Sequence, residues 1–495
     1  MKNKIVVSLP QISKNRIDYY FYLEGGVKKA FSEEMHMFVE YNCDVSNIPI
    51  SIAVIPLLTN IFPIVWLYDA ELVVPICDKD FYESVESFKQ GYINMYPMLE
   101  FKGTMSVGAI KENHIFEKGR SVAFYSGGVD ATDMLIRHIL EKPLLLSIWG
   151  LNILLEDEPG WNNILVQLKN IQKEYSLNFI TVKSNFRTFI NVPQLNQLVD
   201  VTKTLWFYGF QNGIGILGLA APVAYLNGIS TVYIASTNID ERCSSVPSID
   251  GEVRYCGAKV VHDASGLMRQ EKIHNIITDA REKHRRVLLN VCWTKNKPNG
   301  TINCCKCAKC LQTMLGIYAE GCDPKEYGFY YDEKDWKKSN LKMQYRLNEN
   351  FNSGWLQYTL NTIHRNYTYN EVRDDLKWFF NMKPDDFETI DISECLLEPI
   401  AKKGYEKKVL VWSACYKTDK VVAELKKAGI DIYGYIDQKS GMMNTYNDHI
   451  VYDKNILQED RFFVYVALDT VYYDVVEYLK KNDYVEYEDY FYPNS

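Results

Sequence analysis

The stretch Val122-Ala123-Phe124-Tyr125-Ser126-Gly127-Gly128-Val129-Asp130-Ala131-Thr132 decides the fold expected for this chain of 495 residues. Its apolar start predicts a buried strand, Ser-Gly-Gly predicts a tight turn, and a helix is expected over 131–140. Two consecutive glycines allow positive φ and let an anion approach the backbone. Amides at a helix start favour negative charge, and Ser126 and Thr132 add hydroxyl donors. The alternative is a strand-to-helix turn with a purely structural role.

Downstream of this turn, strand patterns and helical patterns alternate along the chain. Alternation of this kind predicts an α/β fold, in which a parallel sheet is covered by helices on both faces. The strands are expected over 144–149, 179–182, 231–236 and 287–291, and the helices over 161–175, 214–227, 268–281 and 311–319.

The rest of the chain divides by composition. Strand-like runs and a helical pattern near 81–94 make the first part an α+β domain without a chemical motif. An aromatic and charged stretch with helical patterns over 356–365 and 370–380 reads as connecting structure. Strand and helix alternate again near the end, as in a small Rossmann-type domain, with strands expected over 409–413, 432–436 and 462–468 and helices over 418–427 and 472–481. We therefore expect four parts, at 1–115, 116–321, 322–404 and 405–495.

Composition and charge exclude several classes of protein. Apolar residues make up 47% of the chain and charged residues 24%, which is ordinary globular usage. The formal charge of −8 opposes a nucleic-acid partner. No secretory signal is evident, and prolines and acidic residues interrupt the apolar stretch from Ile50 to Val74. We expect a cytoplasmic protein without a membrane span, whose partner is a small molecule or a protein.

Five cysteines gather within nineteen residues after the expected strand over 287–291. A Cys-x2-Cys-x2-Cys run with one further thiolate suits tetrahedral Zn²⁺. An iron–sulfur cluster and a set of free thiols are the alternatives, and Cys305 could replace Cys304 as a ligand. In the cytosol such clusters are more often metal sites than disulfides. We expect the zinc ligands to be Cys292, Cys304, Cys307 and Cys310.

The string Ser-Gly-Gly-Val-Asp-Ala-Thr resembles the signature of the ATP pyrophosphatase (PP-loop) superfamily, Ser-Gly-Gly-x-Asp-Ser/Thr. Ala131 departs from it, and the hydroxyl residue stands one place later. The resemblance implies a doubly wound parallel sheet and cleavage of ATP between the α and β phosphates. AMP is transferred to a carboxylate or carbonyl oxygen, and a nitrogen or sulfur nucleophile then displaces it. With Mg²⁺, the pyrophosphate would be held by Ser126, Gly127, Gly128, Val129, Asp130 and Thr132.

The order of the motifs is similar to that of 7-cyano-7-deazaguanine synthase, the nitrile-forming enzyme family of queuosine biosynthesis. The similarity covers 121–321 and includes a core followed by the cysteine run. It implies that the zinc holds a lobe beside the substrate pocket, and that Lys272 faces the nucleotide and acts with Asp130 in catalysis. The stretch 240–250 lacks the Pro-Asp-Cys-Arg-Pro string of that family, and the flanking domains are absent from the short biosynthetic enzyme.

The expected function is therefore ATP-dependent adenylation of a carboxylate, followed by attack of ammonia or an amine to give an amide or nitrile. By analogy with relatives in anti-phage defence, the flanking domains would suit a protein substrate. The alternatives are a degenerate nucleotide-binding or scaffold protein, and a PP-loop enzyme that modifies a surface-polysaccharide sugar or a protein. The sequence leaves open the acid, the nucleophile and the oligomeric state.

Several single residues have both a functional and a structural interpretation. As phosphate or carboxylate partners, or else as surface charges, we note Lys183, Arg187, Arg242, Arg269 and Lys272. His262 and Asp263 are a base with its orienter or a polar strand end. Cys243 and Cys256 are thiol nucleophiles or buried apolar residues. In the C-terminal domain the first turn has no glycine, so Asp437 is a weak signal for ribose binding.

Overall fold

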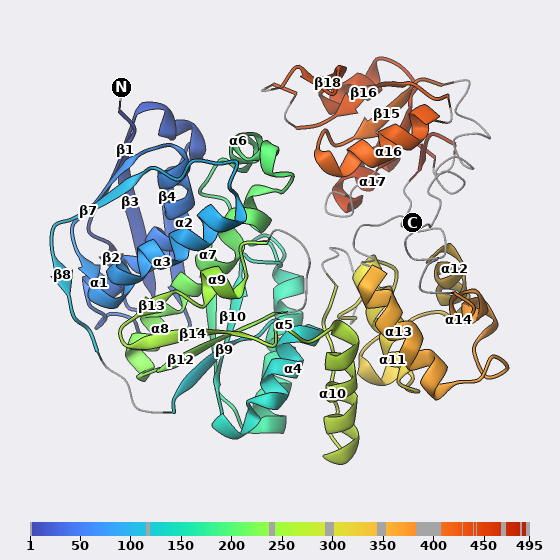
Figure 1. Ribbon diagram of the computed structural model, residues 1–495, viewed down its shortest axis with the longest axis horizontal. Coiled ribbons are helices and arrows are strands. Elements are labelled where there is room, and N and C mark those ends of the chain that lie inside the picture. The colour runs from blue at the N-terminus through green and yellow to red at the C-terminus, as the bar shows by residue number, and fades with distance from the viewer. Residues whose placement is uncertain are drawn as a thin grey trace. The chain divides into compact units, whose positions relative to one another are not determined.

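The computed structural model describes residues 2–114, 119–236, 243–292, 301–343, 353–382, 407–427, 429–438, 440–441, 443–466, 472–485 and 488–491. The chain divides into two compact units, Met1–Arg285 and Arg286–Ser495 (Figure 1). Both contain parallel strands and helices, which confirms the expected α/β class.

The centre of the first unit is a run of five parallel strands. Their order across the sheet is β14-β12-β9-β10-β11, so β9, which comes first of these five in the chain, lies in the middle. Four of the strands coincide with predicted segments to within one or two residues. The strands are β9 (Ser121–Phe124), β10 (Leu144–Trp149), β11 (Phe179–Ser184), β12 (Thr231–Ala235) and β14 (Ala258–Asp263).

The N-terminal segment continues the same sheet. Strand β4 (His36–Tyr41) pairs antiparallel with β11, so the sheet is mixed and mostly parallel. Beyond β4 the order is β3 (Arg16–Glu24), β1 (Lys4–Val7), β5 (Glu71–Val74) and β7 (Thr104–Val107), with β2 (Gln11–Ile12) beside β3. At the other edge, β13 (Arg254–Tyr255) pairs antiparallel with β14.

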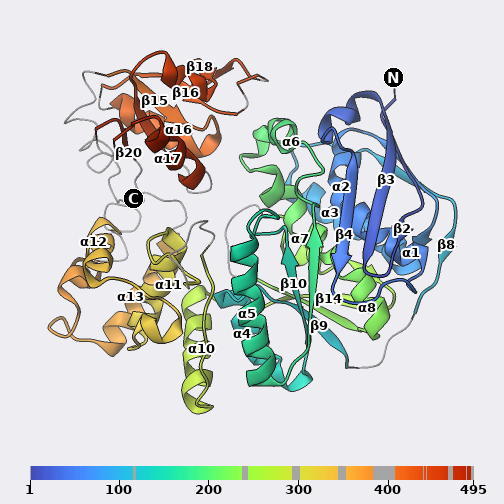
Figure 2. The same cartoon turned by 180° about the vertical axis from the view of Figure 1, so that it is seen from behind.

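Helices cover both faces of the parallel strands. One face packs under α4 (Val129–Arg137) and α5 (Glu158–Tyr175), and α10 (Arg269–Glu282) packs against α4. The other face packs under α2 (Ile55–Leu67), α7 (Asn212–Leu219) and α8 (Ala221–Asn227). Figures 1 and 2 show α4 and α5 on the side of the strands opposite to α2 and α7. Asp157 caps the N-terminus of α5, and its carboxylate accepts a hydrogen bond from the Gly160 N–H.

The apolar stretch from Ile50 to Val74 breaks into three elements of the core. It forms α1 (Ile50–Ala53), α2 and β5, and almost all of the helical residues are buried in protein. Pro56 stands in the first turn of α2, where its missing N–H costs nothing. Among the described residues, no helix combines the length and the apolar character needed to cross a bilayer.

The second unit begins with an extended segment instead of the strand predicted over 287–291. The prediction was wrong because the side chain of Asn303 takes the hydrogen bonds that a neighbouring strand would make. Its Oδ1 accepts from the Val291 N–H, and its Nδ2 donates to the Leu289 carbonyl. The helices that follow are α11 (Ala308–Ala319), α12 (Glu333–Met343), α13 (Ser353–Asn366) and α14 (Lys377–Phe380). Over 370–380, only the end is α-helical.

The C-terminal segment carries a second, mostly parallel sheet with the order β17-β18-β16-β15-β19-β20. The three predicted strands and the two predicted helices are present to within two residues at each end, and the described residues add three short strands that were not predicted. The strands are β15 (Val409–Trp412), β16 (Ile432–Ile436), β17 (Thr445–Tyr446), β18 (His449–Tyr452), β19 (Phe463–Val466) and β20 (Tyr490–Phe491), and the helices are α16 (Tyr416–Lys427) and α17 (Tyr472–Lys481). The carboxylate of Asp437 accepts from the Ala414 N–H at 2.8 Å, and so closes the turn after β15.

Candidate functional site

The glycine turn lies between the end of β9 and the start of α4. Only Gly127 has a positive φ, +78°, whereas Gly128 is extended with φ −75° and ψ 174° and stands at the N-cap of α4. Of the two glycines, Gly127 therefore uses the positive φ that glycine allows, and Gly128 does not. The Gly128 N–H points to Ser126 Oγ at 3.4 Å, so the serine side chain folds back over the turn.

The turn stands where the order of the parallel strands reverses. From β9 the chain moves to β10 and then β11 on one side, and later to β12 and β14 on the other. In open α/β sheets, ligands bind in the crevice at the carboxyl ends of the strands beside such a switch point. The geometry therefore makes this edge of the sheet, between β9 and β12, a candidate ligand site.

Two basic side chains from the first turn of α10 converge on Asp130. Lys272 Nζ lies 3.0 Å from Asp130 Oδ1, and Arg269 Nη1 lies 3.4 Å from Asp130 Oδ2. Lys272 is fully buried and also donates to the carbonyl of Ser236, which follows β12. The structure thus joins the start of α4 to the end of β12 and the start of α10, both of which lie more than a hundred residues further along the chain.

Thr132 and Gln167 also contact the turn region. Thr132 is buried, and its Oγ1 lies 3.3 Å from the hydroxyl of Tyr125. Gln167 comes from α5, and a Cβ atom on Gly127 would lie 2.5 Å from its Oε1. Sequence reasoning did not select Gln167, because no spacing relative to the turn marks a polar residue in the middle of a helix.

His262 and Asp263 point to opposite faces of β14, because neighbouring residues of a strand alternate. Asp263 accepts hydrogen bonds from Arg137 and His138 of α4; burial would raise the pKa of Asp263, but these bonds outweigh it and lower the pKa. His262 is buried with Asp250, at 3.7 Å between Nε2 and Oδ2. Asp263 therefore does not orient His262, and the base-with-orienter interpretation of that pair is wrong.

Burial also distinguishes between the two interpretations of Cys243 and Cys256. Cys243 and Cys256 are buried, and burial raises the pKa of each thiol, which fits the interpretation as apolar core residues. Arg242 and the two residues before it, at the start of the stretch 240–250 that departs from the family pattern, lie outside the described residues.

Four cysteines of the second unit form a cluster that could hold a metal ion. The sulfur atoms of Cys292, Cys304, Cys307 and Cys310 all lie within 4.8 Å of one another. Two of the S–S distances are 3.9 Å, close to the roughly 3.8 Å expected between thiolates 2.3 Å from a tetrahedral zinc ion. Cys305 is not in the cluster, since its sulfur faces the backbone carbonyl of Asn303 at 3.8 Å.

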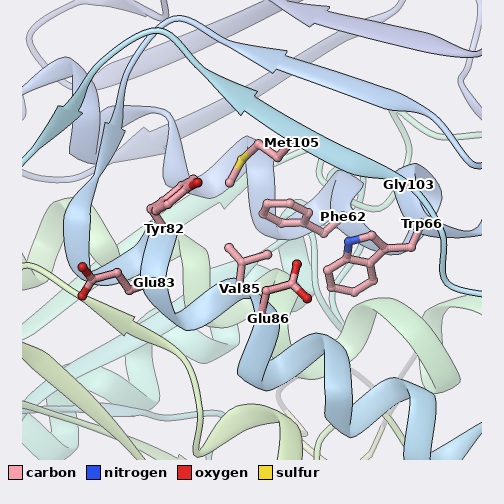
Figure 3. Close-up of a pocket in the computed structure, with 8 residues that line it drawn as sticks. All are labelled: Phe62, Trp66, Tyr82, Glu83, Val85, Glu86, Gly103 and Met105. Atoms are coloured by element: carbon pink, nitrogen blue, oxygen red, sulfur yellow. The ribbon is translucent and has the colours of Figure 1, made fainter.

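A pocket of about 240 Å³ lies elsewhere in the first unit, over α2, β7 and α3 (Lys79–Met95). Figure 3 shows aromatic rings beside the carboxylate of Glu86. The lining residues include two carboxylates and no basic side chain, so the pocket does not suit a phosphate. They are Phe62, Trp66, Tyr82, Glu83, Val85, Glu86, Gly103 and Met105.

Compared with family models, curated proteins and solved structures, the chain shows no match.

Proposed function

We propose that this chain is an ATP-dependent adenylating enzyme of the PP-loop type, similar to 7-cyano-7-deazaguanine synthase. The observation that carries the proposal is the position of the Ser-Gly-Gly turn. It lies at the switch point of the parallel sheet and opens α4, and Lys272 and Arg269 converge on Asp130 beside it. This combination offers backbone amides, a helix start and two cations to a polyphosphate.

In the first step, a carboxylate oxygen of the substrate attacks the α-phosphorus of ATP. The bond from this phosphorus to the oxygen that bridges to the β-phosphate breaks, and pyrophosphate leaves. The amides at the start of α4 offset the charge that develops on pyrophosphate, while Lys272 and Arg269 supply fixed positive charge. Since Lys272 is already held in place by Ser236, little reorganisation is needed.

In the second step, ammonia or an amine attacks the carbonyl carbon of the adenylate, and AMP leaves. The product is an amide, and loss of water from a primary amide would give a nitrile. Attack requires an uncharged nitrogen, and with ammonia or an amine this nitrogen gives up one proton as the amide forms and AMP leaves.

Two metal ions belong to the proposal. The carboxylate of Asp130 is 28% exposed at the turn and fits Mg²⁺, which binds through one or two carboxylates and the substrate phosphates. Mg²⁺ would neutralise phosphate charge. The four clustered cysteines fit Zn²⁺, and a closed shell of four thiolates supplies folding energy to the second unit without an open position for chemistry.

Product analysis tests the proposal. Purified protein with ATP, Mg²⁺ and a panel of carboxylic acids is expected to release AMP and pyrophosphate with at least one acid. Release of ADP and orthophosphate would contradict the assignment. Nucleotide binding without turnover for every acid would instead favour the degenerate binding protein.

A further inference from the structure

Arg187 is held in one orientation at the same edge of the sheet, and none of the described carboxylates forms an ion pair with it. It follows the end of β11, and its Nη1 donates to the carbonyl of Leu151, just after β10, at 2.6 Å. Its guanidinium carbon lies 3.8 Å from the ring centroid of Phe207. A hydrogen bond and a stacked ring therefore fix one orientation of the guanidinium across the ends of two neighbouring strands.

The electrostatic surroundings of Arg187 are unusual for a largely enclosed charge. Within the described residues it has no carboxylate partner, and burial lowers its pKa to about 10 without an opposing interaction. It still carries its charge at neutral pH. Its Nε and Nη2 make no hydrogen bond to described residues, and neither nitrogen is buried without a partner. These donors are open to a ligand.

We propose that Arg187 binds the carboxylate of the acid that is adenylated. This inference rests on the proposed function. Its guanidinium stands beside the end of β10, which is the strand next to β9 and its glycine turn. Lys272 and Arg269 lie on the opposite side of that turn, next to the end of β12. The planar guanidinium has N–H donors spaced to bind both oxygens of a carboxylate. Binding in this way would orient the carboxylate oxygen that forms the bond to the α-phosphorus as pyrophosphate leaves. No proton moves to or from Arg187.

Variants of the full chain test this role, with Arg16 as a matched control. Arg16 also stacks on a phenylalanine, Phe38 at 4.1 Å, but it is paired with Asp18 and Glu40. In pyrophosphate release, Arg187→Gln is expected to raise KM for the acid by about tenfold or more and to change KM for ATP by less than about twofold. Arg187→Lys should be intermediate, because it keeps the charge and loses the fork. Arg16→Gln should leave both constants unchanged.

A rise in KM for ATP alone would overturn the proposal, because the bound anion would then be a phosphate. Unchanged constants in Arg187→Gln would also overturn it and leave Arg187 a packing residue. Equal melting temperatures of the variants exclude unfolding as the cause.

A second measurement needs no turnover, so it separates failure of this inference from failure of the proposed function. The full chain is labelled with phenylglyoxal, and modification of Arg187 is followed by peptide mass spectrometry. Benzoate is expected to slow the modification of Arg187 but not that of Arg16. Protection by pyrophosphate alone, or by neither anion, would contradict carboxylate binding. An absence of pyrophosphate release in the wild-type assay would count against the proposed function alone.

Discussion

At the residue scale, the two glycines of the turn have different physical tasks. Gly127 occupies the left-handed region, and a Cβ there would also collide with the side chain of Gln167. Gly128 has a φ that every residue can adopt. Its lack of a side chain is therefore not required by the backbone, and the approach of a phosphate is the reason we propose for it.

The first prediction separates these tasks. Gly127→Ala should destabilise the protein by about 1–2 kcal/mol because of its positive φ. Gly128→Ala should leave the melting temperature nearly unchanged and lower pyrophosphate release by about a hundredfold, because its methyl group blocks phosphate approach. Calorimetry and product analysis measure the two effects. If Gly128→Ala turned over ATP at the wild-type rate, the turn would have only a structural role.

At the scale of elements, the four-cysteine cluster links the extended segment before residue 293 with the start of α11. Asn303 fixes this geometry, since it bonds to Val291 N–H and to the carbonyls of Leu289 and Gly328. Its side chain holds the segment that carries Cys292 next to the loop and the first turn of α11, which carry the other three cysteines. The arrangement brings the four sulfur atoms within 4.8 Å of one another.

The second prediction concerns this cluster. We expect one zinc ion per chain, and Cys304→Ser should lose it, with destabilisation of the second unit by several of the roughly 10 kcal/mol that structural zinc can supply. Cys305→Ser is the matched control and should keep the metal. Elemental analysis and thermal unfolding measure both. The reverse pattern would make Cys305 the ligand, and iron with visible absorbance would indicate an iron–sulfur cluster.

The third prediction concerns acid stability at the end of the C-terminal sheet. Asp489 is buried just before β20, 2.5 Å from Arg461 Nη2 and 2.7 Å from Lys407 Nζ. Burial would raise the pKa of Asp489, but these partners outweigh it and lower the pKa to about 2. Because the folded pKa is below the unfolded value, the stabilisation is complete above about pH 4 and is lost as pH falls toward 2.

Asp489→Asn should therefore reduce the free energy of unfolding of the second unit by about 1–2 kcal/mol at pH 7, and by almost nothing near pH 2. Urea titrations of both proteins at several pH values measure this difference. Asp460→Asn is the control, since the ion pair of Asp460 with Lys408 is exposed on both sides. A difference that stays constant with pH would contradict the assignment.

At the scale of the whole molecule, the phosphate-handling residues of the proposal all belong to the first unit, whereas the cysteine cluster and the C-terminal sheet belong to the second. The N-terminal strands extend the sheet of the first unit, and β4 pairs with β11. The sheet thus places the N-terminal segment next to the strand that leads to Arg187.

The fourth prediction separates adenylation from transfer. A chain that ends at about residue 404 should still form adenylate from a small acid, because every residue of the proposed phosphate site is retained. Transfer to the physiological nucleophile should fall much further, since the missing segment would position that substrate. Single-turnover measurements of both steps decide it. Equal losses would mean that residues 405–495 support folding, and equal retention would make them irrelevant to catalysis.

Much of the fold followed from local pattern. The alternation of apolar segments predicted β10, β16 and α17 to the residue, because strands and helices of these lengths follow from periodicity and turn residues. The segment over 287–291 has the same apolar pattern as a strand. The segment does not form a strand because a strand needs a neighbouring strand to pair with. Here the side chain of Asn303 accepts the hydrogen bond of the Val291 N–H instead.

The sequence by itself determined the class of fold, the glycine turn and the set of cysteines, since each depends on residues close together in the chain. Only the tertiary structure decided which distant groups meet: Lys272 and Arg269 with Asp130, Gln167 with Gly127, and Arg187 with Leu151 and Phe207. The physical reason is that these contacts depend on strand order and helix packing. Strand order and helix packing are set by the packing of the entire core, so no short stretch of the sequence predicts them.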